Sequence, residues 1–223
     1  MSYGMGDVSF SLSLPEGLGI SYFNQEKGLI GSLTVGLNGE ERDSQEYSVL
    51  GIVKDHSPRT KKLLLDTPTA SAPVSYDAAI GFQALKGMIG GSIRYYPTSL
   101  DYQLVGQEDT DYQGLLYSLF YSTNRSLTEK LSFSAMLGVE YMNQDYADAW
   151  YTVLFPTAEL DAFDADAGLR DAMFSLQVSR AFSEKVEVSL LVAGNLLLAD
   201  AGKSPYTVER FQPSTLIYAV YKF

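Results

Sequence analysis

The chain has 223 residues, of which 46% are hydrophobic and 19% are charged, and its formal net charge is −11. This acidic balance argues against nucleic acid as a partner, and the absence of cysteine excludes disulfides, thiolate metal sites and a cysteine nucleophile. The single histidine argues against a zinc site or a catalytic triad, and no apolar run reaches the roughly 18 residues of a transmembrane helix.

Apolar and polar residues alternate along most of the chain, with the period of two that a β-strand produces. The segment 7–25 keeps this alternation up to Leu14 and then meets Pro15, so it is either one long strand or a short hairpin. Clearer strands are expected near 28–38, 72–85, 87–97, 112–123, 130–142, 168–182, 185–199 and 212–223. We therefore expect about ten strands, within a range of 8 to 12, and 38–71 could hold two more at 47–53 and 61–66.

The polar side of each strand consists mainly of Ser, Gly, Gln, Asn, Asp and Arg, with few Lys or Glu. Such residues suit a crowded lumen, while the apolar side would face lipid in an outer-membrane barrel. A soluble barrel, with the apolar side packed in a closed interior, is the alternative. The membrane barrel places Leu131, Phe133, Leu137, Val139, Val188, Leu190 and Val192 outside, and Ser132, Ser134, Glu140 and Ser189 inside.

Short and long connections alternate along the chain. The short ones are 24–27, 85–87, 123–129 and 182–184, and the long ones are 38–71, 98–111, 143–167 and 200–212. Alternate connections of an up-and-down barrel lie at the same end, so we expect all tight turns at one rim and all long loops at the other. The sequence therefore predicts a single all-β domain over 1–223, an antiparallel up-and-down transmembrane β-barrel, with Phe223 at the tight-turn rim.

The segment Leu85-Lys86-Gly87-Met88 reads as a two-residue hairpin with Lys86 and Gly87 in the turn, because glycine accepts positive φ. Pairing Leu85 with Met88 places Ala79 opposite Arg94 and Asp77 opposite Tyr96. Asp77 then becomes the diagonal neighbour of Arg94 on the inner face, within reach of a salt bridge or a shared water.

Three charges, Asp77, Arg94 and Glu140, lie in mid-strand on the polar side, and we expect them to form a polar cluster in the lumen. The functional interpretation is a selectivity constriction, and the structural one is an ion-pair network that fills a narrow barrel. The structural interpretation is favoured, with Glu140 as an alternative partner of Arg94 from across the lumen. Arg180 has the apolar parity but lies beside a tight turn, where it can extend to the membrane interface.

Three other groups of residues could be functional sites, but for each of them we favour a solvated or structural role. His56 lies in a polar loop, and no Gly-x-Ser-x-Gly, phosphate loop or zinc motif is present, so we expect no enzymatic activity, no cofactor and no metal. A solvated acidic loop is favoured over a calcium site at Asp145, Asp148, Asp161, Asp164 and Asp166. Interface girdles are favoured over a sugar-binding platform for the aromatic residues Tyr95, Tyr96, Tyr112, Tyr121, Tyr141, Tyr146, Trp150 and Tyr151.

The carboxyl-terminal third carries more specific motifs. The segment Asp166-Ala167-Gly168-Leu169-Arg170-Asp171 precedes an alternating strand, a Ser-Glu turn and another strand. Ser204-Pro205-Tyr206 then leads into a last strand that ends Tyr221-Lys222-Phe223. This pattern resembles the outer-membrane family of MltA-interacting protein and OmpV, closely over 140–223 and loosely elsewhere. The family has another strand before the Leu14-Pro15 segment, so one alternative is that this chain lacks the first strand of the family.

The resemblance implies a barrel that scaffolds cell-wall enzymes, namely a lytic transglycosylase and a penicillin-binding synthase. A narrow porin-like channel for small solutes is the alternative function. The expected location is the outer membrane, in contact with the lipid bilayer and lipopolysaccharide. The start Met-Ser-Tyr-Gly has no basic or apolar leader, so we expect that a signal peptide has been removed; the alternative is a cytosolic chain.

Overall fold

A computed structural model describes residues 2–5, 8–13, 17–24, 26–37, 41–42, 48–49, 52–53, 69–101, 110–154, 156, 160–207 and 209–221. The strands in the amino-terminal part are β1 (Ser2–Met5), β2 (Val8–Ser13), β3 (Gly17–Asn24), β4 (Leu29–Gly36), β5 (Glu41–Arg42), β6 (Ser48–Val49), β7 (Ile52–Val53) and β8 (Thr69–Ser71). They are followed by β9 (Ser75–Ala84), β10 (Gly87–Asp101), β11 (Thr110–Thr128), β12 (Leu131–Met142), α2 (Gln144–Tyr151), β13 (Gly168–Ala181), β14 (Val186–Leu197), α3 (Ala199–Lys203) and β15 (Phe211–Tyr221).

The main sheet is an antiparallel up-and-down series in the order β1-β2-β3-β4-β9-β10-β11-β12-β13-β14-β15, which confirms the predicted fold class. Among the described residues this path of eleven strands belongs to a 13-stranded sheet, in which β8 pairs with β5 and with β10. The pairing of β2 with β3 within 7–25 agrees with the hairpin that the expected ten strands include, and the eleventh strand is the four-residue β1, which was not predicted. The region 47–53 holds the separate pair β6 and β7, whereas 61–66 lies outside the described residues. In the described part of the chain no ladder joins β15 to β1. The alternative that this chain lacks the first strand of the family it resembles remains a prediction.

The predicted facing of the strands is confirmed. Leu137 is 63% exposed and Leu190 is 42% exposed, whereas Glu140 is 5% exposed and Ser189 is 1% exposed. Exposed outward side chains also include Leu33, Ile80, Phe82, Ile93, Leu119, Leu176 and Ile217. Such a wide apolar face would be costly in water, so these side chains form the surface that meets the hydrocarbon of the bilayer. The described helices include none that is both long and apolar enough to cross a membrane.

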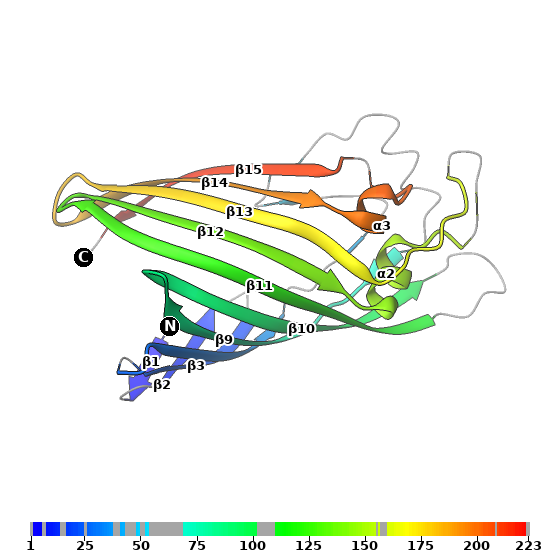
Figure 1. Ribbon diagram of the computed structural model, residues 1–223, viewed down its shortest axis with the longest axis horizontal. Coiled ribbons are helices and arrows are strands. Elements are labelled where there is room, and N and C mark those ends of the chain that lie inside the picture. Colours follow the sequence, from blue (N-terminus) through cyan, green and yellow to red (C-terminus); the bar gives the residue numbers. More distant parts are fainter. Residues whose placement is uncertain are drawn as a thin grey trace.

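The tight turns and the long connections lie at opposite rims, as predicted. Figure 1 shows the β11–β12 and β13–β14 turns together at one end, with α2 and α3 at the other end. We call these ends the short-turn rim and the long-loop rim. The last described strand, β15, runs towards the short-turn rim, while Phe223 itself lies outside the described residues.

The β9–β10 hairpin has a different register from the expected one. Ala84 pairs with Gly87, so the two turn residues are Leu85 and Lys86, with φ of 51° and 63°. Gly87 begins β10 instead, where an added Cβ would lie 2.3 Å from the carbonyl oxygen of Ser122. The glycine is therefore needed for close approach of β11, not for the turn. The register shifts by two residues, so every side chain keeps its predicted face.

This turn provides a prediction about stability. Positive φ at both central positions is favoured by Asn-Gly, and leucine and lysine adopt it only at a cost. Replacing Leu85 by Asn together with Lys86 by Gly should raise the free energy of unfolding in detergent by about 1–2 kcal/mol. In the same thermal unfolding assay Gly87→Ala should lower stability. Equal stability of the two variants would show that this turn geometry is wrong.

Candidate functional site

At the long-loop end of the lumen lies a plug, which we define as α2, the described residues 152–154 and 160–167, and α3. The buried core of the described residues lies here, between the two helices and the adjoining parts of β10, β11, β12 and β14. Tyr146 is 1% exposed and Trp150 is 8% exposed, and they pack with Tyr96, Leu116, Met142 and small alanines of both helices. Within 143–167, α2 and the described residues around Val153, Leu160 and Ala165 are therefore folded inward rather than external. The girdle predicted for Tyr96, Tyr146 and Trp150 is wrong for these residues.

The side chain of Asn143 starts α2 and fixes it to the barrel wall. Its Oδ1 accepts hydrogen bonds from the backbone N–H of Tyr146 at 2.9 Å and of Leu115 at 2.8 Å. Its Nδ2 donates to the carbonyl of Gln113 at 3.1 Å. One residue thus caps the helix and takes the place of a ladder partner for β11, just beyond the last β11–β12 pair, Leu116 with Met142. This geometry directs α2 into the lumen.

The rest of the plug is fixed by side-chain hydrogen bonds to the backbone. Gln144 donates to the carbonyl of Ala165 at 2.8 Å and accepts from the N–H of Ala167 at 3.0 Å. Ser204, just after α3, donates to the carbonyl of Tyr151 at 2.6 Å. These contacts join three separate parts of the chain, so the plug is a folded unit rather than a loose loop.

Asp77 and Arg94 form the predicted ion pair in the lumen. They lie directly opposite each other on β9 and β10, and Arg94 Nε is 3.1 Å from Asp77 Oδ2. Arg94 Nη1 also donates to the hydroxyl of Tyr96 at 3.1 Å. The predicted pairing is confirmed, although the contact is directly across the ladder and not diagonal. Glu140, the alternative partner, pairs elsewhere.

Arg94→Leu should lower the thermal stability of the barrel in detergent. The Arg94 side chain is 39% exposed and that of Asp77 is 21% exposed, so water screens the pair and we expect a loss of only about 1 kcal/mol. Asp77→Asn with Arg94→Leu should recover part of this loss, because the unpaired carboxylate is removed. A double variant less stable than Arg94→Leu would argue against a stabilising pair.

A second ion-pair cluster lies across the lumen, around Arg170. Its Nη2 is 3.1 Å from Glu140 Oε2 and 2.8 Å from Asp171 Oδ2, and its Nη1 donates to the hydroxyl of Tyr146 at 2.9 Å. Glu140 Oε1 also accepts from Ser118 Oγ at 2.7 Å. All of these charged side chains are at most 14% exposed. Arg170 thus connects two buried carboxylates of the wall to the plug.

The two clusters are joined by aromatic rings. The ring of Tyr96 lies 5.7 Å from that of Tyr146, which in turn stacks on Trp150 at 5.8 Å. Arg94 contacts Tyr96 and Arg170 contacts Tyr146. A continuous series of contacts therefore runs from β9 through the plug to β13. The expected cluster of Asp77, Arg94 and Glu140 is really two clusters with this bridge between them.

Sequence reasoning missed Arg170 and Asp171 because they are adjacent. A regular strand would direct them to opposite faces. In the structure Glu140 pairs with Asp171 and Tyr141 pairs with Leu169, so Arg170 is the extra residue of a β-bulge. The sequence feature that could have indicated this β-bulge is the pair of adjacent charged residues at the start of an apolar strand.

The long-loop rim is acidic. Burial and the nearby carboxylates of Asp164 and Asp145 raise the pKa of Asp148, although a hydrogen bond from Gln144 opposes this. Hydrogen bonds from Lys203 and from the N–H of Asp166 lower the pKa of Asp200. Among the described residues no group of three or more His, Cys, Asp or Glu is arranged to hold a metal ion. His56 lies outside the described residues.

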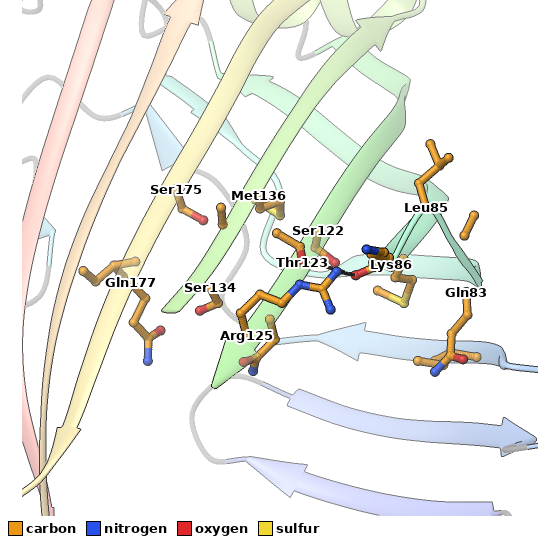
Figure 2. Close-up of a pocket in the computed structure, with 17 residues that line it drawn as sticks. Gln83, Leu85, Lys86, Ser122, Thr123, Arg125, Ser134, Met136, Ser175 and Gln177 are labelled. Carbon is orange, nitrogen blue, oxygen red and sulfur yellow. Dashed lines mark hydrogen bonds between the residues drawn. The ribbon is translucent and has the colours of Figure 1, made fainter. Parts of the chain in front are cut away.

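A cavity of about 900 Å³ occupies the lumen at the short-turn end. The lining includes Gln83, Lys86, Ser122, Thr123, Asn124, Arg125, Ser134, Ser175 and Gln177, with Ile30, Met88, Met136 and Leu191 as apolar members. Figure 2 shows Arg125 extended towards Lys86, whose carbonyl accepts a hydrogen bond from the guanidinium. The short-turn end of the lumen thus holds a largely polar cavity, whereas the buried core around Tyr146 and Trp150 lies at the other end.

Solved structures with a similar arrangement of strands include OmpT, an outer membrane protein of Vibrio cholerae. The in-vitro folded form is 10% identical with a TM-score of 0.45, and the match covers 100% of this chain and 62% of OmpT. The loop L8 deletion mutant gives 10% identity and a TM-score of 0.44, with 99% and 60% covered. This chain therefore spans about three fifths of those proteins.

No curated protein sequence matches the chain. The family model described as MltA-interacting protein MipA matches residues 1–223, the whole sequence. This match agrees with the motifs around Gly168 and Pro205 and with the membrane-facing strands described above. The chain belongs to the MipA family of outer-membrane β-barrel proteins.

Proposed function

We propose that this outer-membrane barrel is a non-enzymatic scaffold that binds cell-wall enzymes at its short-turn rim. The partners are a lytic transglycosylase, to which the family name MltA-interacting protein points, and a penicillin-binding synthase. The outer face contacts the lipid bilayer and, near the long loops, lipopolysaccharide. The alternative function is a narrow channel for small solutes.

The presence of the plug is the observation that favours the scaffold over the channel. Tyr146 and Trp150 are buried in the lumen, and the Arg170 cluster ties α2 to the wall through buried charges. A pathway for solutes would have to displace this core. A barrel with this core in its lumen still exposes both rims. A scaffold needs only such exposed surfaces to bind its partners.

The short-turn rim offers a surface for a protein partner. Tight turns of outer-membrane barrels face the periplasm, where cell-wall enzymes act. Leu85, Leu127 and Phe182 are 80%, 60% and 60% exposed at or next to three successive tight turns. Exposed apolar side chains surrounded by charges such as Lys86 and Lys130 are typical of interaction surfaces. Leu85 is also held at positive φ, a strain that functional surfaces often retain.

Binding of a purified MltA-type transglycosylase to the folded barrel in detergent tests this proposal. Leu127→Ser with Phe182→Ser should weaken binding at least about tenfold, because apolar anchors dominate such interfaces. Leu154→Ser is the matched control, since Leu154 is 54% exposed in the segment at the opposite rim. No binding by the unmodified barrel, or an equal loss in the Leu154 variant, would argue against the short-turn rim as the partner surface.

A further inference from the structure

Outward-facing side chains of β11 hold the β9–β10 turn. Arg125 pairs across the ladder with Phe133, a residue of the outward parity, so its side chain leaves β11 on the lipid-facing side, and Tyr121 shares this parity. The hydroxyl of Tyr121 donates to the carbonyl of Leu85 at 3.0 Å. The guanidinium of Arg125 donates to the carbonyl of Lys86 (Figure 2). The turn is therefore fixed beside Arg125 at the outer edge of the barrel wall.

The two cations at this place have no acidic partner. Arg125 and Lys86 are both exposed, and in the described part of the chain neither forms a salt bridge. The hydrogen bond to the Lys86 carbonyl restrains the guanidinium and uses one of its five N–H donors. The remaining donors of Arg125 and the ammonium of Lys86 are therefore available to an anion.

Three other tight turns at the short-turn rim balance their charges. Each carries one Glu followed by one Lys, at 26–27, 129–130 and 184–185. The β9–β10 turn consists of Leu85 and Lys86 and contains no carboxylate, and Arg125 adds a second positive charge beside it. Two cations that no carboxylate offsets create a local positive potential, even though the chain as a whole is acidic.

This positive patch borders the surface that faces lipid. Phe133 is the neighbour of Arg125 on β12, and the same outward row continues with Val178 and Leu190, which are 41% and 42% exposed. A long cationic side chain at the end of such an apolar face extends to the headgroup layer and not into the hydrocarbon. Because tight turns face the periplasm, the headgroups here belong to the periplasmic leaflet.

We propose that Arg125 and Lys86 bind the phosphate of an anionic glycerophospholipid of the periplasmic leaflet, with an acyl chain lying along Phe133. The planar guanidinium suits two phosphate oxygens, and the ammonium of Lys86 adds a point charge. A zwitterionic phospholipid has the same phosphate, but its own cation offsets the charge, so the patch prefers an anionic lipid. This site requires the membrane-spanning barrel and no protein partner, so it and the scaffold proposal can fail separately.

Native mass spectrometry of the folded barrel in a non-ionic detergent measures lipid binding directly. Dioleoyl-phosphatidylglycerol is the anionic probe, and dioleoyl-phosphatidylcholine is the zwitterionic lipid with the same acyl chains. We expect the anionic lipid to bind at least about tenfold more tightly, and its affinity to fall as salt is raised. Equal affinity for the two lipids overturns the proposal. Displacement of the anionic lipid by an equal concentration of inorganic phosphate would assign the patch to free phosphate and also overturn it.

Variants locate the binding on the barrel. Arg125→Gln with Lys86→Gln should remove the preference for phosphatidylglycerol. Lys130→Gln with Lys185→Gln is the matched control, because it removes the same charge from the same rim in turns that also carry a Glu. The preference should survive in this control.

Lys86→Gln alone is an independent test if the double variant does not fold. It keeps the backbone carbonyl that accepts from Arg125, so the turn should stay in place, and phosphatidylglycerol should bind at least about threefold more weakly. Unchanged binding in the Lys86 variant, or an equal loss of preference in the Lys130 and Lys185 control, contradicts the site.

Discussion

Replacing Arg170 by Met is expected to lower the free energy of unfolding by about 3–5 kcal/mol, the range measured when one partner of a buried ion pair is removed. The side chains of Glu140 and Asp171 are 7% and 0% exposed, so neither carboxylate can gain much hydration when its cation is lost. The same substitution removes the hydrogen bond from Arg170 to Tyr146 and loosens the plug. Thermal unfolding in detergent, followed by near-ultraviolet circular dichroism, measures the effect.

Two companion variants make this test specific. Arg170→Lys keeps the charge but lacks the planar fork that reaches Glu140, Asp171 and Tyr146 together, so it should lose an intermediate amount. Arg180→Met removes an exposed cation from the outer face and should change stability by less than about 1 kcal/mol. An Arg170→Met barrel as stable as the Arg180→Met barrel would show that the buried cluster does not hold the structure together.

Removing α2 and the segment that follows it, which leaves only α3 of the plug, is expected to turn a silent barrel into a conducting one. Met142 and Gly168 are directly paired on β12 and β13, so their backbones are about 5 Å apart and a short turn can replace residues 144–166. The shortened chain should still insert, because its lipid-facing side chains are unchanged. In planar bilayers we expect discrete current steps from this variant and none from the unmodified barrel.

The control for this prediction is a variant that weakens the plug without deleting it. Asn143→Ala removes the cap of α2 and the two contacts to β11, so occasional brief openings are expected. Steady conductance by the unmodified barrel would favour the porin-like alternative. A silent deletion variant would show that something other than the plug closes the lumen.

Much of the wall of this barrel is readable from the sequence, because strand facing depends on a local period of two. Leu137 and Leu190 are exposed and Glu140 and Ser189 are buried, as the alternation predicts. The Asp77–Arg94 pair is confirmed even though the hairpin turn was misplaced. Because the error was two residues, both side chains stayed on the inner face.

The plug could not be read in the same way. A helix of eight residues carries little periodic signal, and its aromatic residues also suit a membrane interface. Its inward direction depends on contacts between distant residues, such as that of Asn143 with Leu115. The β-bulge at Arg170 likewise breaks the alternation that made the rest predictable. The local alternation of residues therefore predicts the strands of the barrel wall, whereas the structure inside the lumen depends on contacts between residues far apart in the sequence.

Labelling of single cysteines in intact cells most directly tests the central claim, that this barrel spans the outer membrane with its short-turn rim in the periplasm. The chain has no cysteine, so each introduced thiol reports on one position. With a large polymer-linked maleimide that cannot cross the outer membrane, Asp161→Cys in the plug segment should be labelled on whole cells. Lys130→Cys at the β11–β12 turn should be labelled only after the outer membrane is permeabilised. Labelling of Lys130→Cys on intact cells, with Asp161→Cys protected, would contradict the account.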